Sequence, residues 1–150
     1  MSKNHTTSEP KKVCDVCIVG GGLAGLVSAI HLAQNNIEVI LFEKNEYPKH
    51  KVCGEYVSNE VLPYLKSLDI DIFQKGAKKI STLKLSHQNG KTLEQTLPLG
   101  GFGISRFTFD QLLAEKALLE NVLIIKDEVL NIDFKKDRFI IKSKYHQILA

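Results

Sequence analysis

The glycine-rich sequence V-G-G-G-L-A-G constrains this chain more than any other feature. It fits the pattern G-x-G-x-x-G, with the three motif glycines at Gly20, Gly22 and Gly25. An apolar run over residues 13–19 precedes it, and an apolar run of helical period follows over residues 23–33. A second β-like run over residues 37–42 ends at Glu43. This order predicts a strand, a tight turn, a helix and a parallel strand, which together make a βαβ dinucleotide-binding unit.

Each position in the glycine segment has a separate expected role. Gly20 allows the tight turn out of the strand, and Gly22 lets the backbone approach a pyrophosphate closely because it has no Cβ. Gly25 lets the helix pack closely on the strand. The amides at the start of the helix, including those of Leu23 and Ala24, lack intrahelical acceptors and are expected to point at the phosphates. The helix dipole favours negative charge at the same place.

Glu43 lies 18 residues after Gly25, at the predicted end of the second strand. A carboxylate there can accept hydrogen bonds from ribose hydroxyls, and such charge-assisted bonds contribute about 1.5–3 kcal/mol each. It also argues against a 2′-phosphate, and therefore against an NADP-type ligand. The alternative reading is a glycine turn that serves packing alone.

Length and charge limit the remaining possibilities. The 150 residues suffice for one ordinary domain. Of the net charge of +3, the first twelve residues carry +2, so the rest offers no electrostatic footprint for nucleic acid. Residues 1–12 are polar, without the apolar core of a signal peptide, and are expected to be disordered. Residues 16–37 contain no Asp, Glu, Lys or Arg, but the glycines and polar Gln34 favour a buried strand plus helix over a membrane span.

The chain has three cysteines, Cys14, Cys17 and Cys53. An odd number without a secretory signal indicates a reducing, cytoplasmic compartment. Cys14 and Cys17 have C-x-x-C spacing. We expect them to lie in one strand, where residues three apart point to opposite faces, so neither a redox pair nor a metal site is predicted.

Downstream of Glu43, residues 44–57 are predicted to form a loop. Ser58 is a plausible N-cap for a helix that runs to about residue 68, with Pro63 near its first turn. Residues 80–86 and 92–97 are predicted to form a hairpin around a turn at residues 89 and 90, which are Asn and Gly.

The last third of the chain indicates one more helix and several strands. Thr108 and Gln111 fit a capping box at the start of a helix that ends at about residue 120. Short strands are predicted at residues 122–125, 128–134, 138–143 and 145–150. The predicted fold class is therefore α/β, a Rossmann-type βαβ core with an inserted antiparallel β-meander. The chain stops at the apparent end of that meander, and we expect a truncated portion of a longer enzyme.

Three segments resemble the FAD-dependent oxidoreductases of the para-hydroxybenzoate hydroxylase-like superfamily, and within it the geranylgeranyl reductase-related branch. The first covers residues 16–43. The second, residues 47–58, is similar to the family's P-x-x-K-x-C-G segment. The third, residues 103–113, is similar to its arginine-bearing strand end followed by D-x-x-L. The resemblance implies that residues 13–150 are the N-terminal part of an FAD-binding domain whose C-terminal substrate region is absent.

The resemblance also implies roles for matched residues. The motif glycines would hold the pyrophosphate, Glu43 the ribose with Lys44 beside it, and Arg106 the diphosphate region. The backbone of Val129 would contact the adenine, while Cys53 and Gly54 would lie near the isoalloxazine ring. The alternatives are a surface charge for Arg106, a solvated charge for Lys44 and a packed thiol for Cys53. No residue is assigned a catalytic role, and no metal is predicted.

The function implied is the FAD-binding portion of a flavin-dependent oxidoreductase of reductase or monooxygenase type. A reduced nicotinamide or another electron donor, and a small-molecule or lipid-like substrate, would be the parent enzyme's partners. Two alternatives stay open: an NAD-dependent dehydrogenase fragment, and a non-catalytic truncated remnant that binds nucleotide weakly or not at all.

Overall fold

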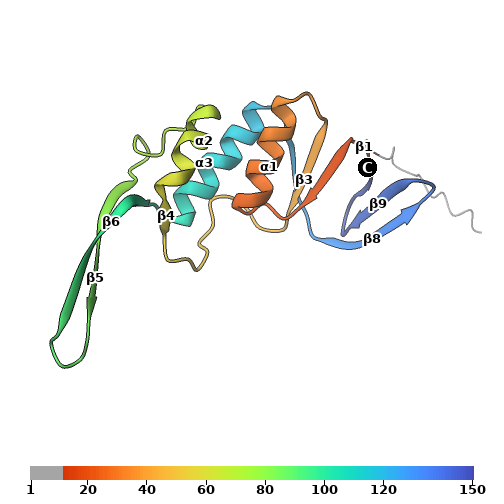
Figure 1. The fold of residues 1–150 in the computed structure, drawn as a ribbon. Coiled ribbons are helices and arrows are strands. Elements are labelled where there is room, and N and C mark those ends of the chain that lie inside the picture. The colour runs from red at the N-terminus through yellow and green to blue at the C-terminus, as the bar shows by residue number, and fades with distance from the viewer. Residues whose placement is uncertain (1–11) are drawn as a thin grey trace, which may run out of the picture. The chain divides into compact units, whose positions relative to one another are not determined.

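A computed structural model describes residues 12–150, shown in Figure 1. The predicted disordered tail falls on residues 1–11, outside the described residues, except that Lys12 lies in a short strand, β1 (Lys12–Val13). The chain divides into two compact units. One combines the chain up to Glu46 with Ala114–Ala150, and the other is Tyr47–Leu113.

A parallel sheet forms the centre of the first unit. Its strands, in spatial order, are β2 (Val16–Val19), β3 (Val39–Glu43) and β7 (Leu123–Lys126). Every residue of β3 is buried, as expected for a central strand covered on both faces. The predicted Rossmann-type core is therefore confirmed. Each of the three strands ends within one residue of its predicted C-terminal end, but β2 starts three residues later than predicted.

Helix α1 (Leu23–Gln34) connects β2 to β3 and packs against both strands. Leu26, Ala29 and Ile30 are buried on one side, which gives the amphipathic pattern of a helix covering a sheet. Asn36 adopts φ 61° just after the helix, a left-handed conformation that asparagine tolerates at a helix end. Among the described residues, no helix has both the length and the apolar character needed to cross a bilayer.

A second sheet of the first unit has the order β1-β10-β9-β8. It contains the predicted meander, β8 (Val129–Lys135), β9 (Arg138–Ser143) and β10 (Gln147–Leu149), and β1 adds to β10 in parallel. Ile141 and Ile148 from this sheet pack in one cluster with Ile40 and Phe42 of the parallel sheet. The two sheets of the unit thus share a hydrophobic core.

The C-x-x-C segment differs from expectation. The amides of Asp15 and Val16 both donate to the carbonyl of Glu38, so the predicted strand is interrupted before β2. This irregularity resets the alternation of side chains, as bulges do. Cys14 and Cys17 therefore both contact the same core cluster, and the prediction that they face opposite sides was wrong.

The second unit contains a three-stranded antiparallel sheet of order β4-β6-β5. The strands are β4 (Tyr56–Ser58), β5 (Lys78–Ser86) and β6 (Thr92–Gly103). The loop predicted over residues 44–57 ends two residues early, because β4 pairs with the end of β6. Figure 1 shows β5 and β6 as a long two-stranded arm. The predicted turn is present, with Gly90 at φ +84°.

Two short helical segments follow β4. Ser58 accepts a hydrogen bond from the amide of Glu60 and caps a 3-10 turn, η1 (Asn59–Val61). This turn continues into α2 (Leu62–Ser67), which has a proline in its first turn. The predicted cap and the place of the proline are therefore confirmed.

Helix α3 (Arg106–Leu119) begins two residues before the predicted N-cap. The hydroxyl of Ser105 accepts a hydrogen bond from the amide of Thr108 at 3.2 Å, and the carbonyl of Ser105 accepts one from Phe109. Ser105 is therefore the N-cap, and Thr108 occupies the third helical position. The capping box predicted at Thr108 was wrong by one helical turn.

Candidate functional site

The turn between β2 and α1 needs glycine at two positions. Gly20 has φ +106°, and its amide donates to the carbonyl of Phe42 at 2.8 Å. A Cβ on Gly25 would lie 2.0 Å from the carbonyl oxygen of Gly20, which no side chain could accommodate without movement of the backbone. The turn is thus compact because Gly25 lets the start of α1 lie against the end of β2.

The N-terminus of α1 presents backbone amides without a side-chain cap. Gly22 is the N-cap, and its carbonyl accepts the first helical bond from Leu26 at 2.9 Å. No acidic residue stands in the first turn of α1. The first amides of the helix, at Leu23 and Ala24, therefore form the positive end of the helix dipole, which suits an anionic group.

Glu43 is buried at the end of β3, with 7% of its surface exposed. Its Oε2 accepts from the amide of Gly21 at 2.9 Å. Its Oε1 accepts from both the amide and the side-chain amide of Asn45, each at 2.9 Å. The acid is therefore held against the glycine turn. Asn45 was missed by sequence reasoning, although an asparagine two residues after a strand-end acid is a recognisable turn signal.

Lys44 follows Glu43 directly in the chain, and the end of β7 leads to Val129. The amide of Asp127, which follows β7, donates to the carbonyl of Glu43 at 3.1 Å, and β8 starts two residues later at Val129. Lys44 forms an exposed ion pair with Glu128, with 3.6 Å between Nζ and Oε1. The structure thus brings the predicted residues of the first unit together at the carboxyl ends of the parallel strands.

Asp127 is a buried acid that sequence reasoning missed. Its carboxylate accepts from the hydroxyl of Ser143 at 2.6 Å, the amide of Tyr145 at 2.9 Å and the amide of Glu128 at 2.8 Å. Nδ1 of His146 lies 2.8 Å from the same carboxylate. Burial opposes ionisation, yet these hydrogen bonds hold the pKa of Asp127 well below its usual range.

The group of Asp127, Ser143 and His146 has the composition of a nucleophilic triad but not its geometry. The partners of the Ser143 hydroxyl are the carboxylate of Asp127 and, at 3.1 Å, the backbone carbonyl of His146. Neither partner is the imidazole ring of His146. A nucleophilic serine must instead lie against the histidine that takes its proton. The arrangement joins the start of β8 to the turn before β10.

In the second unit, Arg106 forms a bidentate ion pair with Asp110, with distances of 2.6 and 2.8 Å. Asp110 has no exposed surface. Its hydrogen bond is the main cause that raises the pKa of Arg106, and the side chain of Cys53 adds to the shift. Cys53 is exposed, and its sulfur accepts from the amide of Glu55 at 3.4 Å. The structure thus brings Arg106 and Cys53 together, with Gly54 next in the chain.

Cys14 and Cys17 are unsuited to thiolate chemistry. Burial is the main cause that raises the pKa of both, and Cys17 reaches about 12 with a further contribution from Cys14. At neutral pH both thiols therefore stay protonated. Among the described residues no group of three or more His, Cys, Asp or Glu side chains is arranged to hold a metal ion.

Comparison with known proteins bears directly on the glycine turn and Glu43. Residues 15–54 match the FAD dependent oxidoreductase family. The resemblance of this segment to FAD-dependent oxidoreductases is thereby confirmed. The matched segment contains β2, α1 and β3.

Two curated relatives extend the similarity beyond that segment. The chain is 32% identical over 130 residues to methylenetetrahydrofolate–tRNA-(uracil-5-)-methyltransferase TrmFO 1 of Mesoplasma florum, covering 81% of this chain and 28% of that protein. It is 27% identical over 138 residues to digeranylgeranylglycerophospholipid reductase 1 of Methanothermobacter thermautotrophicus, covering 87% of this chain and 34% of that protein. The chain thus spans about a third or less of these relatives.

The fold is shared with solved flavoproteins. The flavin-dependent brominase Bmp2 superposes with a TM-score of 0.77 at 19% identity, over 91% of this chain and 36% of that one. The relatives therefore include the geranylgeranyl reductase type that sequence analysis named. They also include flavin-dependent halogenases, which it did not name.

Proposed function

We propose that the first unit binds the ADP half of FAD at the carboxyl ends of β2, β3 and β7, as the cofactor site of a flavin-dependent oxidoreductase. One observation carries the proposal: the amide of Gly21 donates to Glu43, so the phosphate-binding turn and the ribose-binding acid form one joined structure. Ligands of open α/β sheets bind at this edge of the sheet. The close approach of Gly25 to Gly20 gives the turn the compact shape that a pyrophosphate requires.

The first unit offers groups for three parts of the ligand: the pyrophosphate, the ribose and the adenine. The amides of Leu23 and Ala24, at the uncapped start of α1, would donate to the pyrophosphate, with Gly22 allowing close approach. The carboxylate of Glu43, already oriented by Gly21 and Asn45, would accept from the ribose hydroxyls. Beyond it, the adenine would lie against the backbone of Val129.

In the second unit, the resemblance assigns Arg106 to the diphosphate and Cys53 and Gly54 to the isoalloxazine ring. Two donors of the Arg106 guanidinium are bonded to Asp110, which fixes its orientation. A guanidinium has five N–H donors, so others remain to meet a phosphate oxygen. Gly54 has open space around its Cα, since an added Cβ would meet no atom within 4 Å. A flat ring could therefore approach the backbone there.

Bound FAD would supply the hydride and electron transfer, and the protein would supply position and charge. The proposed parent activity is of reductase or monooxygenase type, with a reduced nicotinamide or similar donor and a small-molecule or lipid-like substrate. The similarity to digeranylgeranylglycerophospholipid reductase 1 supports the reductase type. The three free cysteines support a reducing, cytoplasmic compartment.

The test starts with purified chain that is mixed with FAD, desalted and examined by absorbance, followed by identification of the released nucleotide. We expect a flavin spectrum and released FAD. Glu43→Gln should weaken FAD binding about tenfold, the loss expected for one charge-assisted hydrogen bond. The matched control is Glu46→Gln, because Glu46 is an exposed acid three residues away that pairs with Lys126. It should bind like the parent chain.

Two results would overturn the proposal. One is a colourless protein that also shows no saturable binding of FAD or ADP by calorimetry. The other is preferential binding of NADH, which would favour the dehydrogenase alternative. If Glu43→Gln and Glu46→Gln lost the same FAD affinity, the loss would reflect the net charge of the protein, and Glu43 would have no specific role at the ribose.

A further inference from the structure

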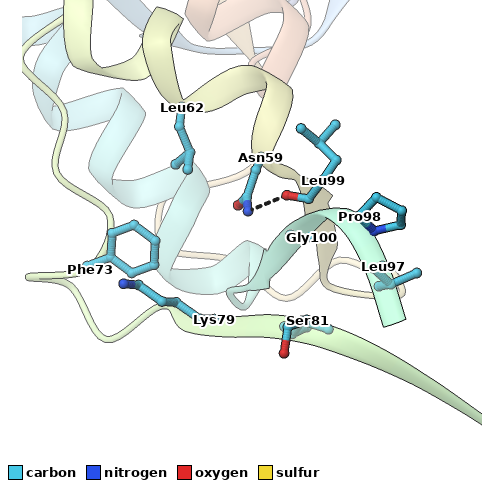
Figure 2. Close-up of a pocket in the computed structure, with 11 residues that line it drawn as sticks. Asn59, Leu62, Phe73, Lys79, Ser81, Leu97, Pro98, Leu99 and Gly100 are labelled. Carbon is cyan, nitrogen blue, oxygen red and sulfur yellow. Dashed lines mark hydrogen bonds between the residues drawn. The ribbon is translucent and has the colours of Figure 1, made fainter. Parts of the chain in front are cut away.

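The second unit contains a hollow of about 410 Å³ where β6 bulges away from β5, as Figure 2 shows. Ile80 pairs with Gly101, but Thr82 pairs with Thr96. Residues 97–100 therefore lie opposite Ser81 alone, and four residues of β6 leave the regular ladder. Bulges of this kind are common beside ligand sites because they direct backbone and side chains out of the sheet.

The bulge is held in shape by two side chains. Nδ2 of Asn59 donates to the carbonyl of Leu99 at 2.9 Å, drawn as a dashed line in Figure 2. The hydroxyl of Tyr56 donates to the carbonyl of Gly100 at 3.1 Å. Gly100 has φ +66°, and an added Cβ would lie 3.1 Å from both Asn59 Nδ2 and the carbonyl oxygen of Ile80. The hollow is thus a preformed feature, and preformed sites bind at lower entropic cost.

The lining combines apolar surface with one cation. The apolar part consists of Leu62, Phe73, Leu97, Pro98 and Leu99. The cation is Lys79, whose Nζ lies 5.6 Å from the ring centroid of Phe73 and points toward that ring in Figure 2. Among the described residues, no acid forms an ion pair with Lys79. The positive charge therefore faces an apolar surface without a counter-charge from the protein.

We propose that this hollow binds a small organic carboxylate with an apolar body. The carboxylate meets Lys79, and the body packs on Leu62 and Phe73. The volume lies at the small end of the range for ligand pockets. A phosphate group is a poorer match, since the hollow offers one lysine without the arginine fork or helix N-terminus that phosphates favour.

The proposed site is independent of the FAD proposal. None of the predicted cofactor-binding residues lines the hollow. A chain that binds no FAD could still bind the acid, and a chain that binds FAD could fail to bind it. The two proposals therefore fail separately.

The test titrates the full chain, labelled with ¹⁵N, with 3-phenylpropionate and follows the backbone amide signals. We expect saturable shifts at Asn59, Lys79 and Leu99. The neutral analogue 3-phenylpropan-1-ol, which has the same apolar body, should bind several times more weakly. Lys79→Met should raise the Kd roughly fivefold, the upper range for a solvent-accessible charge pair.

Lys84→Met is the matched control, because Lys84 is exposed on the same strand and does not line the hollow. It should leave the Kd within about twofold, the lower range for an exposed charge pair. Lys79→Gln repeats the charge removal in case the methionine variant does not fold. Equal binding of acid and alcohol, or equal losses at Lys79 and Lys84, would overturn the carboxylate assignment. The absence of saturable shifts around the hollow would overturn the site itself.

Discussion

The amide of Gly21 donates a 2.9 Å hydrogen bond to Oε2 of Glu43, linking the turn after β2 to the last residue of β3. The two segments are 22 residues apart in the sequence. Because the acid is also bound by Asn45 on its other oxygen, its orientation is set by the protein before any ligand arrives. Glu43 therefore has a structural role in the turn in addition to the proposed ribose contact.

Gly25→Ala is expected to destabilise the first unit. The added methyl group would lie 2.0 Å from the carbonyl oxygen of Gly20. That oxygen is backbone, so the clash can be relieved only if the backbone moves. Overpacking costs typically about 1–3 kcal/mol, and we expect a loss of free energy of unfolding near the upper value. Urea denaturation measures it. Gly54→Ala is the control, because its Cβ meets nothing within 4 Å, and it should stay within about 0.5 kcal/mol of the parent. Equal losses in the two variants would contradict the steric argument.

Acid should remove a stabilising contribution of Asp127. Its native pKa lies below the ordinary value, so the contribution is fully present above the unfolded pKa of about 3.9 and is lost as pH falls through the native pKa. Urea unfolding between pH 7 and pH 3 should therefore show a steeper loss in the parent chain than in Asp127→Asn. Asp137→Asn, at the exposed turn between β8 and β9, should keep the parent's slope. Parallel curves for all three proteins would contradict the role of Asp127.

Only Cys53 of the three thiols should react rapidly with Ellman's reagent at pH 8. Cys53 is exposed, whereas Cys14 is buried and Cys17 is half-buried. Burial raises the pKa of Cys14 and raises that of Cys17 to about 12, so both thiols stay protonated. After unfolding in guanidinium chloride, all three thiols should react rapidly. In Cys53→Ser the rapid phase should disappear. A second rapid thiol in the folded protein would show that the C-x-x-C segment is accessible.

The βαβ core was predictable because its signals are local. Gly20, Gly25 and Glu43 are each required by a short-range geometric constraint that is the same in every such unit. The hydrogen bond between Gly21 and Glu43 follows from the same geometry. Asn45 completes the arrangement, and it could have been recognised from its position in the turn.

Other features depend on contacts that sequence patterns do not encode. Thr108 and Gln111 matched a capping box. In the structure β6 ends at Gly103 and the hydroxyl of Ser105 accepts from the amide of Thr108, so the helix starts earlier. Cys14 and Cys17 face one cluster because two amides share the carbonyl of Glu38. Local patterns cannot choose between such alternatives when tertiary hydrogen bonds decide them.

The full length of β6 and its hollow were likewise not predicted. Pro98, Gly100 and Gly101 are residues that normally argue against a strand. In the structure Pro98 and Gly100 lie in the bulge. Gly101 is paired just after it, where an added Cβ would lie 2.4 Å from the ring of Tyr56. Glycine in a strand can therefore indicate close packing as well as an end, and the sequence alone does not separate the two.

Variants of the ion pair between Arg106 and Asp110 should separate the structural role of Arg106 from its proposed role in FAD binding. Asp110 is fully buried, so Arg106→Met leaves an uncompensated carboxylate and should cost about 3–5 kcal/mol in free energy of unfolding. The double variant Arg106→Met/Asp110→Leu removes both charges and should recover most of that stability. If Arg106 also contacts the diphosphate, the double variant will fold but bind FAD at least about tenfold more weakly, as for a lost charge-assisted bond. Parent-like FAD affinity in the stable double variant would leave Arg106 with a purely structural role.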